Sequence, residues 1–201
     1  MHILLNIGFS LDKNKFIENS LARIICLSEN LHQSSFGHAE RVGRYCVKIA
    51  EKIGWTEEQT KLIKTAGTLH DIGKISVPSD ILFKKTPLTE NEINIIRKHP
   101  FLSALFLRSL NVFNDIIPWV YHHHENYNGT GYPKGILGEN IPEGARIIRI
   151  ADAYDAMRSK RIYKPDKNKK ETISEIKSRI GCDFDPTFAE IFLKILEKES
   201  D

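Results

Sequence analysis

Apolar residues recur every three or four positions along most of the chain, a spacing that places them on one face of an α-helix. The clearest run covers residues 38–53 and consists of Ala39, Val42, Tyr45, Cys46, Ile49, Ala50 and Ile53. Two sequences of the capping-box type, at residues 56–59 and 89–92, predict the starts of two further helices. The second of these is expected to continue past His99.

The second half of the chain continues this pattern. Pro118 suits the first turn of a short helix. Residues 146–158 and 186–198 have helical spacing, and Asp185 stands at the expected N-cap of the last helix. Strand patterns are scarce, so we predict an all-α fold.

Two stretches interrupt the helical pattern. Residues 75–87 and 126–144 are rich in Gly or Pro and are predicted to be loops. A long ordered loop in a helical domain is uncommon and is often functional. Residues 1–28 are predicted to form a helix, either packing on the domain or remaining from a linker, and residues 29–201 to form the single domain.

Composition narrows the class of protein. Hydrophobic residues make up 41% of the 201 residues and charged residues 27%, which is ordinary for a globular chain. No apolar run approaches the roughly 20 residues that span a bilayer, and no signal-peptide pattern is present. The cysteines lack metal or redox spacing, which fits a reducing cytoplasm: Cys26, Cys46 and Cys182. We therefore predict a cytoplasmic protein without membrane insertion.

The net charge of +3 does not indicate a large nucleic acid as partner. The basic residues concentrate at residues 158–170. By charge alone this run is a solvated loop, whereas its alternative interpretation is an edge that binds phosphate.

Histidine and aspartate carry the candidate chemistry. His70 and Asp71 are predicted to close a helix and to enter a turn that contains Gly73. An imidazole and a carboxylate together suit iron, manganese or zinc, and one aspartate can bridge two metals about 3.5–4 Å apart. Asp152 and Asp155 share one face of a predicted helix, and apolar neighbours indicate that Asp152 is buried. A buried carboxylate needs a partner, which a metal would supply.

A series of motifs spans the chain from about residue 29 to its end. In order they are His38-Ala-Glu-Arg41-Val42, Leu69-His70-Asp71-Ile72-Gly73-Lys74-Ile75, Val77-Pro78-Ser79-Asp80-Ile81-Leu82, His99-Pro100, His123-His124-Glu125, Asn128-Gly129-Thr130-Gly131-Tyr132-Pro133, Ile141-Pro142, Ala145-Arg146-Ile147-Ile148, Ala151-Asp152-Ala153-Tyr154-Asp155-Ala156, Arg161-Ile162-Tyr163 and Phe184-Asp185-Pro186. Their order and spacing resemble the HD-GYP family, the cyclic di-GMP phosphodiesterases within the HD hydrolase superfamily.

This resemblance implies a single helical bundle with the Gly/Pro-rich loop beside a site for two divalent metals, iron by preference or manganese. The implied ligands, bridged by Asp71, are His38, His70, Asp71, His99, His123 and Asp152, with His124 near the metals. Lys74 would contact the reacting phosphate, and Asp71 and Lys74 are the implied catalytic residues. The other implied substrate-binding residues are Arg161, Lys164, Asp155 and Tyr132. The loop with Tyr132 is also implicated in contacts with diguanylate cyclase (GGDEF) domains.

The implied reaction is attack on phosphorus by a hydroxide that bridges the metals, giving linear pGpG and, after a second cut, GMP. Ser34 stands where some family members have a glutamate ligand for a third metal, so we expect two metals. Ser103 stands where the family usually has glycine, and we expect little consequence. His122 is expected at the surface or behind the ligands.

Three alternatives stay open at this level: a phosphodiesterase for cyclic GMP-AMP, a non-catalytic module that binds cyclic di-GMP or docks on a cyclase domain, and a general nucleotide hydrolase.

Overall fold

The computed structural model describes residues 17, 20, 21, 23, 37–111, 113–159 and 168–198. Arg161 and Lys164, which we predict to bind substrate, lie outside the described residues, as do Ser34 and most of residues 1–28. The four described residues of that N-terminal segment are helical, and Leu21 among them is buried in the hydrophobic core.

The described part of the chain is helical, which confirms the all-α prediction. Its elements are α2 (His38–Lys52), α3 (Glu57–Leu69), η1 (Ile72–Ser76), α4 (Ser79–Leu82), α5 (Glu90–Ile96), α6 (His99–Leu110), η2 (Asn114–Ile116), α7 (Ile117–Tyr121), η3 (Gly138–Asn140), α8 (Glu143–Arg158), α9 (Lys169–Ser178) and α10 (Pro186–Lys198). Among the described residues, extended pairing is limited to two single bridges, Asn128 with Leu137 and Ile180 with Phe184.

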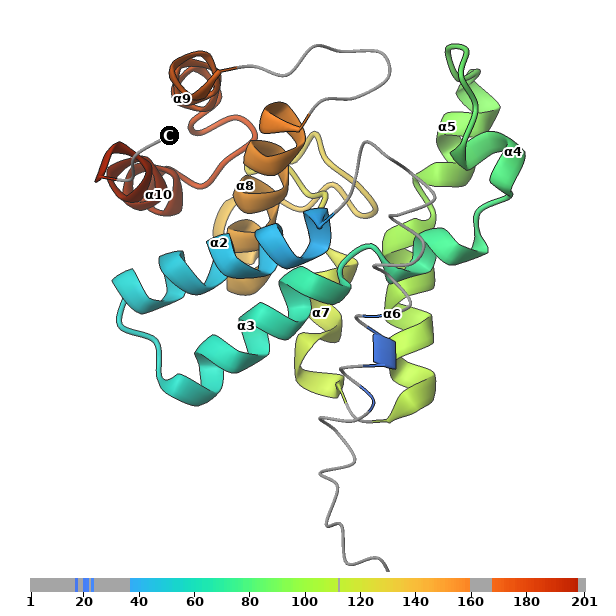
Figure 1. Cartoon of the computed structure of the whole chain (residues 1–201), viewed down its shortest axis with the longest axis horizontal. Coiled ribbons are helices and arrows are strands. Elements are labelled where there is room, and N and C mark those ends of the chain that lie inside the picture. Colours follow the sequence, from blue (N-terminus) through green and yellow to red (C-terminus); the bar gives the residue numbers. More distant parts are fainter. Residues whose placement is uncertain are drawn as a thin grey trace, which may run out of the picture.

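The helices α2 and α3 lie side by side (Figure 1). A short connection after Lys52 joins them, so the two helices run antiparallel. The start of α2 and the end of α3 therefore lie at the same end of the pair. The helix α8 packs across α2, α7 packs against α6 and α8, and η1 packs on α6. Their apolar faces share one core with that of α10. This core includes Val42, Ile49, Leu69, Ile148 and, from α10, Phe192.

Capping chemistry accounts for several helix starts. Thr56 and Thr89 each accept a hydrogen bond from the backbone three residues on, and the side chain at that third position returns one. Asp185 Oδ1 accepts from the backbone nitrogens of Thr187 and Phe188 at the start of α10, as expected. The helix α9 was not predicted, although Asn168 caps it through the same kind of box.

The helix predicted to run from residue 90 past His99 is two helices, so that prediction is wrong. The helix α5 ends at Ile96, and α6 begins at His99 with a proline in its first turn. In a continuous helix the Pro100 ring would clash with the carbonyl of Ile96, four residues earlier. The Pro100 nitrogen also has no hydrogen to donate to that carbonyl. Instead, His99 Nδ1 donates to that carbonyl at 2.7 Å. The break thus fixes the ring of His99.

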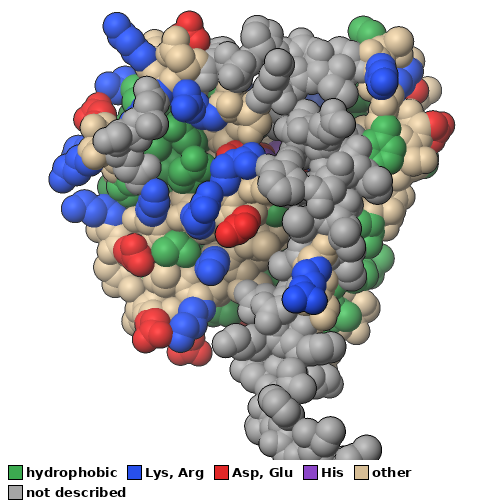
Figure 2. Space-filling model, viewed as in Figure 1, with side chains coloured by type: hydrophobic (Ala, Val, Ile, Leu, Met, Phe, Trp, Pro, Cys, Tyr) green, Lys and Arg blue, Asp and Glu red, His purple; other side chains and the backbone are tan. Residues whose placement is uncertain are grey.

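Lys and Arg side chains are spread over the α2 and α9 side of the face seen in Figure 2, with Asp and Glu side chains among them.

Candidate metal centre

The structure brings all seven predicted metal ligands to one place: six lie at or next to helix ends, and Asp152 lies within the body of α8. They are the first residue of α2 (His38), the two residues that follow Leu69 of α3 (His70, Asp71), the first residue of α6 (His99), two residues of the turn after α7 (His123, His124) and a residue of α8 (Asp152). The helix bodies pack in the core, and these side chains face one another. Five distant segments thereby contribute to one site.

The first group of ligand atoms surrounds the Oδ2 atom of Asp71. His38 Nε2 lies 3.9 Å and His70 Nε2 3.4 Å from this oxygen. Asp152 Oδ1 completes the group, 3.3 Å from His38 Nε2 and 3.9 Å from His70 Nε2. His38, His70 and Asp71 therefore form one candidate metal group, and Asp152 lies beside its two imidazoles.

The second group surrounds the other oxygen of the same carboxylate. His99 Nε2 lies 3.1 Å and His123 Nε2 3.9 Å from Asp71 Oδ1. His99 Nε2 is also 3.3 Å from His123 Nε2 and 3.1 Å from His124 Nε2. Asp71 is the member that the two groups share.

These separations fit divalent metals. Ligand atoms about 2.1 Å from one ion are roughly 3.0 Å apart at cis octahedral positions, roughly 3.4 Å in a tetrahedron and roughly 4.2 Å at trans octahedral positions. His70 Nε2 and Asp71 Oδ1 are, in addition, buried with no hydrogen-bond partner among the described residues. Buried polar atoms without partners are costly, and an ion between them would remove that cost. The donor set of imidazoles and carboxylates suits iron, manganese or zinc.

Hydrogen bonds at the far side of each ring aim the imidazoles. His70, His99 and His123 each use Nδ1 to donate to the carbonyl three residues earlier, at 2.7, 2.7 and 2.6 Å. A carbonyl only accepts, so Nδ1 carries the proton and Nε2 keeps the lone pair that a metal needs. Carbonyl groups of the helices that precede them thus hold the three candidate ligands in the correct tautomer.

His38 is held by Asp155 instead of a carbonyl. Its Nδ1 lies 2.7 Å from Asp155 Oδ2, and Arg41 binds the same carboxylate through Nε at 2.6 Å and Nη2 at 3.0 Å. Asp155 is 1% exposed. This differs from the sequence interpretation, which placed Asp155 among the substrate-binding residues. Its carboxylate is instead buried behind His38, where Arg41 balances its charge. The contribution of Arg41 was not predicted.

The charge states suit metal binding at most of these positions. Burial lowers the pKa of His123 and His124 well below the usual range, so both rings are neutral. Burial alone would raise the pKa of Asp71, but Lys74 and His70 lower it well below the usual range. His38 differs, because Asp152 and Asp155 outweigh burial and raise its pKa to about 9. In the metal-free protein, His38 therefore holds a proton that a metal must displace.

Ser103 connects α6 to the His70–Asp71 turn, which corrects our expectation of little consequence at this position. Its hydroxyl donates to the His70 carbonyl at 2.8 Å and accepts from the Gly73 nitrogen at 2.8 Å, and its side chain is fully buried. A β-carbon on Gly73 would lie 2.4 Å from the carbonyl oxygen of His99. The glycine and the serine together allow the turn to sit against α6, so that Asp71 reaches both groups of ligands.

The loop that contains Gly131, Tyr132 and Pro133 (the Gly-Tyr-Pro loop) packs beside the second group of ligand atoms. Glu125 is buried and accepts hydrogen bonds from the backbone nitrogens of Lys134 and Gly135 at 2.7 and 2.9 Å. A β-carbon on Gly131 would lie 2.1 Å from a backbone nitrogen, so this position requires glycine. The Tyr132 ring stacks on His124 with centroids 4.8 Å apart. The prediction of a long ordered loop at the metal site agrees with this arrangement.

Lys74 and His122 occupy the edge of the site. Lys74 Nζ pairs with Asp71 Oδ2, and its side chain is 37% exposed. His122 Nδ1 faces Glu125 Oε1 at 3.4 Å, so it lies behind the ligands. Of the residues predicted to bind substrate, Lys74 and Tyr132 therefore lie at the metal centre.

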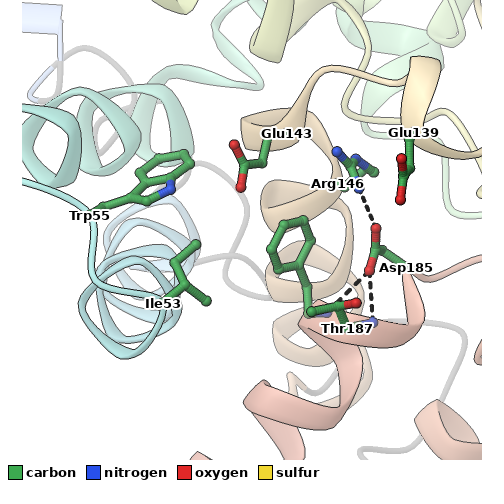
Figure 3. Close-up of a pocket in the computed structure, with 8 residues that line it drawn as sticks. Ile53, Trp55, Glu139, Glu143, Arg146, Asp185 and Thr187 are labelled. Carbon is green, nitrogen blue, oxygen red and sulfur yellow. Dashed lines mark hydrogen bonds and ion pairs between the residues drawn. The ribbon is translucent and has the colours of Figure 1, made fainter.

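A separate hollow of about 360 Å³ lies where the connection between α2 and α3 faces the starts of α8 and α10 (Figure 3). Trp55 and Phe188 form its apolar walls. Arg146, which also lines it, is paired with Asp185 and donates to the Ile141 carbonyl, so its charge is already balanced. None of the metal ligands lines this hollow.

The HD domain sequence profile matches residues 19–188 of the chain. The chain belongs to the HD domain family. The HD pair of this chain is His70 and Asp71, whose carboxylate is shared by both groups of ligands.

Curated relatives that are named as phosphodiesterases of cyclic dinucleotides match most of the chain. The cyclic di-GMP phosphodiesterase response regulator RpfG of Xanthomonas campestris pv. campestris is 34% identical over 177 residues, which cover 87% of this chain and 47% of that protein. A cyclic di-GMP phosphodiesterase of Thermotoga maritima is 37% identical over 193 residues, covering 95% and 52%. The 3′3′-cGAMP-specific phosphodiesterase 2 of Vibrio cholerae is 31% identical over 194 residues, covering 94% and 37%. The chain spans about half the length of these relatives, or less.

Solved structures share the fold. Bd1817, an HD-GYP-type protein of Bdellovibrio bacteriovorus, superposes with a TM-score of 0.68 at 20% identity, covering 92% of this chain and 63% of that one. The HD domain of the Listeria monocytogenes phosphodiesterase PgpH, in complex with cyclic di-AMP, gives 0.63 at 22% identity, covering 88% and 93%. With the curated relatives, the first of these confirms the resemblance to the HD-GYP family. None of the helices in the described part of the chain has the length and apolarity that a membrane crossing requires.

Proposed function

We propose that this chain is a metal-dependent phosphodiesterase that hydrolyses cyclic di-GMP. The observation that carries the proposal is the position of Asp71, whose two oxygens face two separate groups of ligands. A carboxylate shared in this way is typical of two-metal phosphoesterases. Iron is the preferred metal of the proposal, and manganese is the alternative.

The proposed metal positions follow from the two groups. One ion would be held by His38, His70, Asp71 and Asp152, and the other by Asp71, His99, His123 and His124. Two divalent ions at these positions would stabilise negative charge on the phosphate oxygens and would lower the pKa of a bound water, so that hydroxide would be available as the nucleophile near neutral pH.

Lys74 is the proposed protein contact to the reacting phosphate. Its ammonium group already lies at the carboxylate of Asp71, and its side chain is partly exposed. A phosphate bound at the site would bring negative charge within reach of this flexible side chain. Arg161 and Lys164 remain the predicted contacts to other phosphate oxygens. Hydrolysis of one P–O bond would give linear pGpG, and a second hydrolysis would give GMP.

The names of the curated relatives support a cyclic dinucleotide as the substrate. Those from X. campestris and T. maritima are named for cyclic di-GMP, while one from V. cholerae is named for 3′3′-cGAMP. Cyclic GMP-AMP is therefore the second candidate substrate. A diguanylate cyclase domain is the proposed partner of the loop that carries Tyr132.

The test is anaerobic incubation of the protein with ferrous iron or manganese and each cyclic dinucleotide, with products separated by chromatography. Asp71→Ala should abolish turnover, because both metal positions lose a ligand. Asp80→Ala, an exposed aspartate outside the site, is the matched control and should retain full activity. If the metal-loaded wild type binds cyclic di-GMP and cyclic GMP-AMP tightly but cleaves neither, the chain is a binding module and the proposal is wrong.

A further inference from the structure

The Tyr132 ring contacts both the candidate ligand His124 and Arg97, a cation for which the sequence predicted no role. On one side it stacks on His124, with centroids 4.8 Å apart and an angle of 22° between the planes. The guanidinium carbon of Arg97 lies 5.5 Å from the centre of the same ring. Arg97 follows directly after α5, two residues before the ligand His99. The break between α5 and α6 therefore brings an arginine to the rim of the site.

Arg97 differs from the other described cations near the ligands in how its charge is balanced. Lys74 pairs with Asp71, and Arg149 donates to Asn126 and pairs with Asp183 at 3.4 Å. Arg97 is exposed, and no ion pair holds its guanidinium among the residues that the structure describes. A guanidinium that rests on an aromatic face keeps its edge free to donate two parallel hydrogen bonds.

A cyclic dinucleotide carries two phosphates in one ring, and only one of them can lie on the metals at a time. The second phosphate then lies away from the metals, where a cation beside the site can bind it. Arg97 lies one aromatic ring away from a metal ligand and has a free donor edge. A planar fork of N–H groups matches a phosphate in a bidentate pair.

We propose that Arg97 binds the non-reacting phosphate of the cyclic dinucleotide. This inference rests on the proposed function. Arg97 acts on substrate binding, and the chemistry at the metals does not involve it. Its removal is therefore expected to weaken binding of substrates with two phosphates and to spare substrates with one.

The experiment compares wild type, Arg97→Ala, Arg97→Lys and Lys98→Ala, whose side chain is exposed next to Arg97. Each protein is loaded with manganese and assayed with cyclic di-GMP, cyclic di-AMP and bis(p-nitrophenyl) phosphate, which has a single phosphate. Arg97→Ala should raise KM for cyclic di-GMP about tenfold or more with little change in kcat, as expected for loss of a charge-assisted hydrogen bond. Arg97→Lys should recover part of the loss, and Lys98→Ala should match wild type.

Several results would overturn the proposal. An unchanged KM for cyclic di-GMP would show that Arg97 does not contact the substrate. An equal loss with bis(p-nitrophenyl) phosphate would show that Arg97 only supports the site through Tyr132. A loss with cyclic di-GMP but none with cyclic di-AMP, where the wild type accepts both, would show that Arg97 binds guanine instead.

Calorimetric titration of cyclic di-GMP into the same variants separates this inference from the proposed function. If the wild type binds cyclic di-GMP without cleaving it, the proposed function fails, and a tenfold weaker Kd for Arg97→Ala still supports the role of Arg97. If the wild type cleaves bis(p-nitrophenyl) phosphate but neither binds nor cleaves cyclic di-GMP, both proposals fail.

Discussion

Replacing Ser103 with alanine is expected to destabilise the metal centre, although Ser103 bonds only to backbone atoms of the His70–Asp71 turn. The Ser103 hydroxyl is buried and connects the His70 carbonyl and the Gly73 nitrogen, each at 2.8 Å. Ser103→Ala leaves one buried acceptor and one buried donor without a partner, at about 1–3 kcal/mol each. The free energy of unfolding should therefore fall by roughly 2–6 kcal/mol. For a domain of this size, that corresponds to a fall in Tm of roughly 4–24 °C.

The assay is thermal unfolding of the metal-free protein followed by circular dichroism. Ser109→Ala is the matched control, because Ser109 lies on the same helix and its exposed hydroxyl donates only to the Phe106 carbonyl within that helix. Its Tm should stay within about 2 °C of wild type. Metal titration of the folded variants should show weaker binding for Ser103→Ala, since Asp71 follows His70 directly. If the two variants unfold at the same temperature, the hydroxyl does not hold the turn, and the reasoning is refuted.

Three further predictions concern the surroundings of the ligands. The raised pKa of His38, about 9, leaves its ring protonated in the metal-free protein, so manganese affinity at this position should rise up to tenfold per pH unit between pH 6.5 and 8.5. Calorimetry in buffers of different ionisation enthalpy should detect one released proton. An affinity that does not change with pH would contradict the assignment. Asp155→Asn should weaken metal binding about 10–100-fold by calorimetry, since it removes the charge behind His38, whereas the exposed Asp80→Asn should not. Gly131→Ala should displace the loop, because its β-carbon would lie 2.1 Å from a backbone nitrogen, and turnover should fall more than tenfold. Lys134 is exposed on the same loop, and Lys134→Ala should retain wild-type turnover.

Local interactions explain which helices the sequence predicts well. The run at residues 38–53 and the capping residues Thr56 and Thr89 act within one or two turns, so their signals are present in the sequence itself. The break at Pro100 was also encoded locally, because a proline ring excludes the carbonyl four residues earlier. The apolar spacing on both sides of the break concealed it, and α9 was missed because its capping residue Asn168 follows a run of basic residues.

The candidate ligands could be named from the sequence, because its motifs resemble those of the HD-GYP family. Their partition into two groups could not be predicted, because it depends on which oxygen of Asp71 faces which helix end. The position of Asp155 behind His38, the bridge made by Ser103 and the approach of Arg97 to Tyr132 were likewise decided by packing. Each of these contacts joins segments at least 30 residues apart in the chain, and only the tertiary structure brings such segments within hydrogen-bonding or ring-contact distance. The sequence thus determined the helices and the donor atoms, while the tertiary structure decided which atoms meet and which side chains hold them in place.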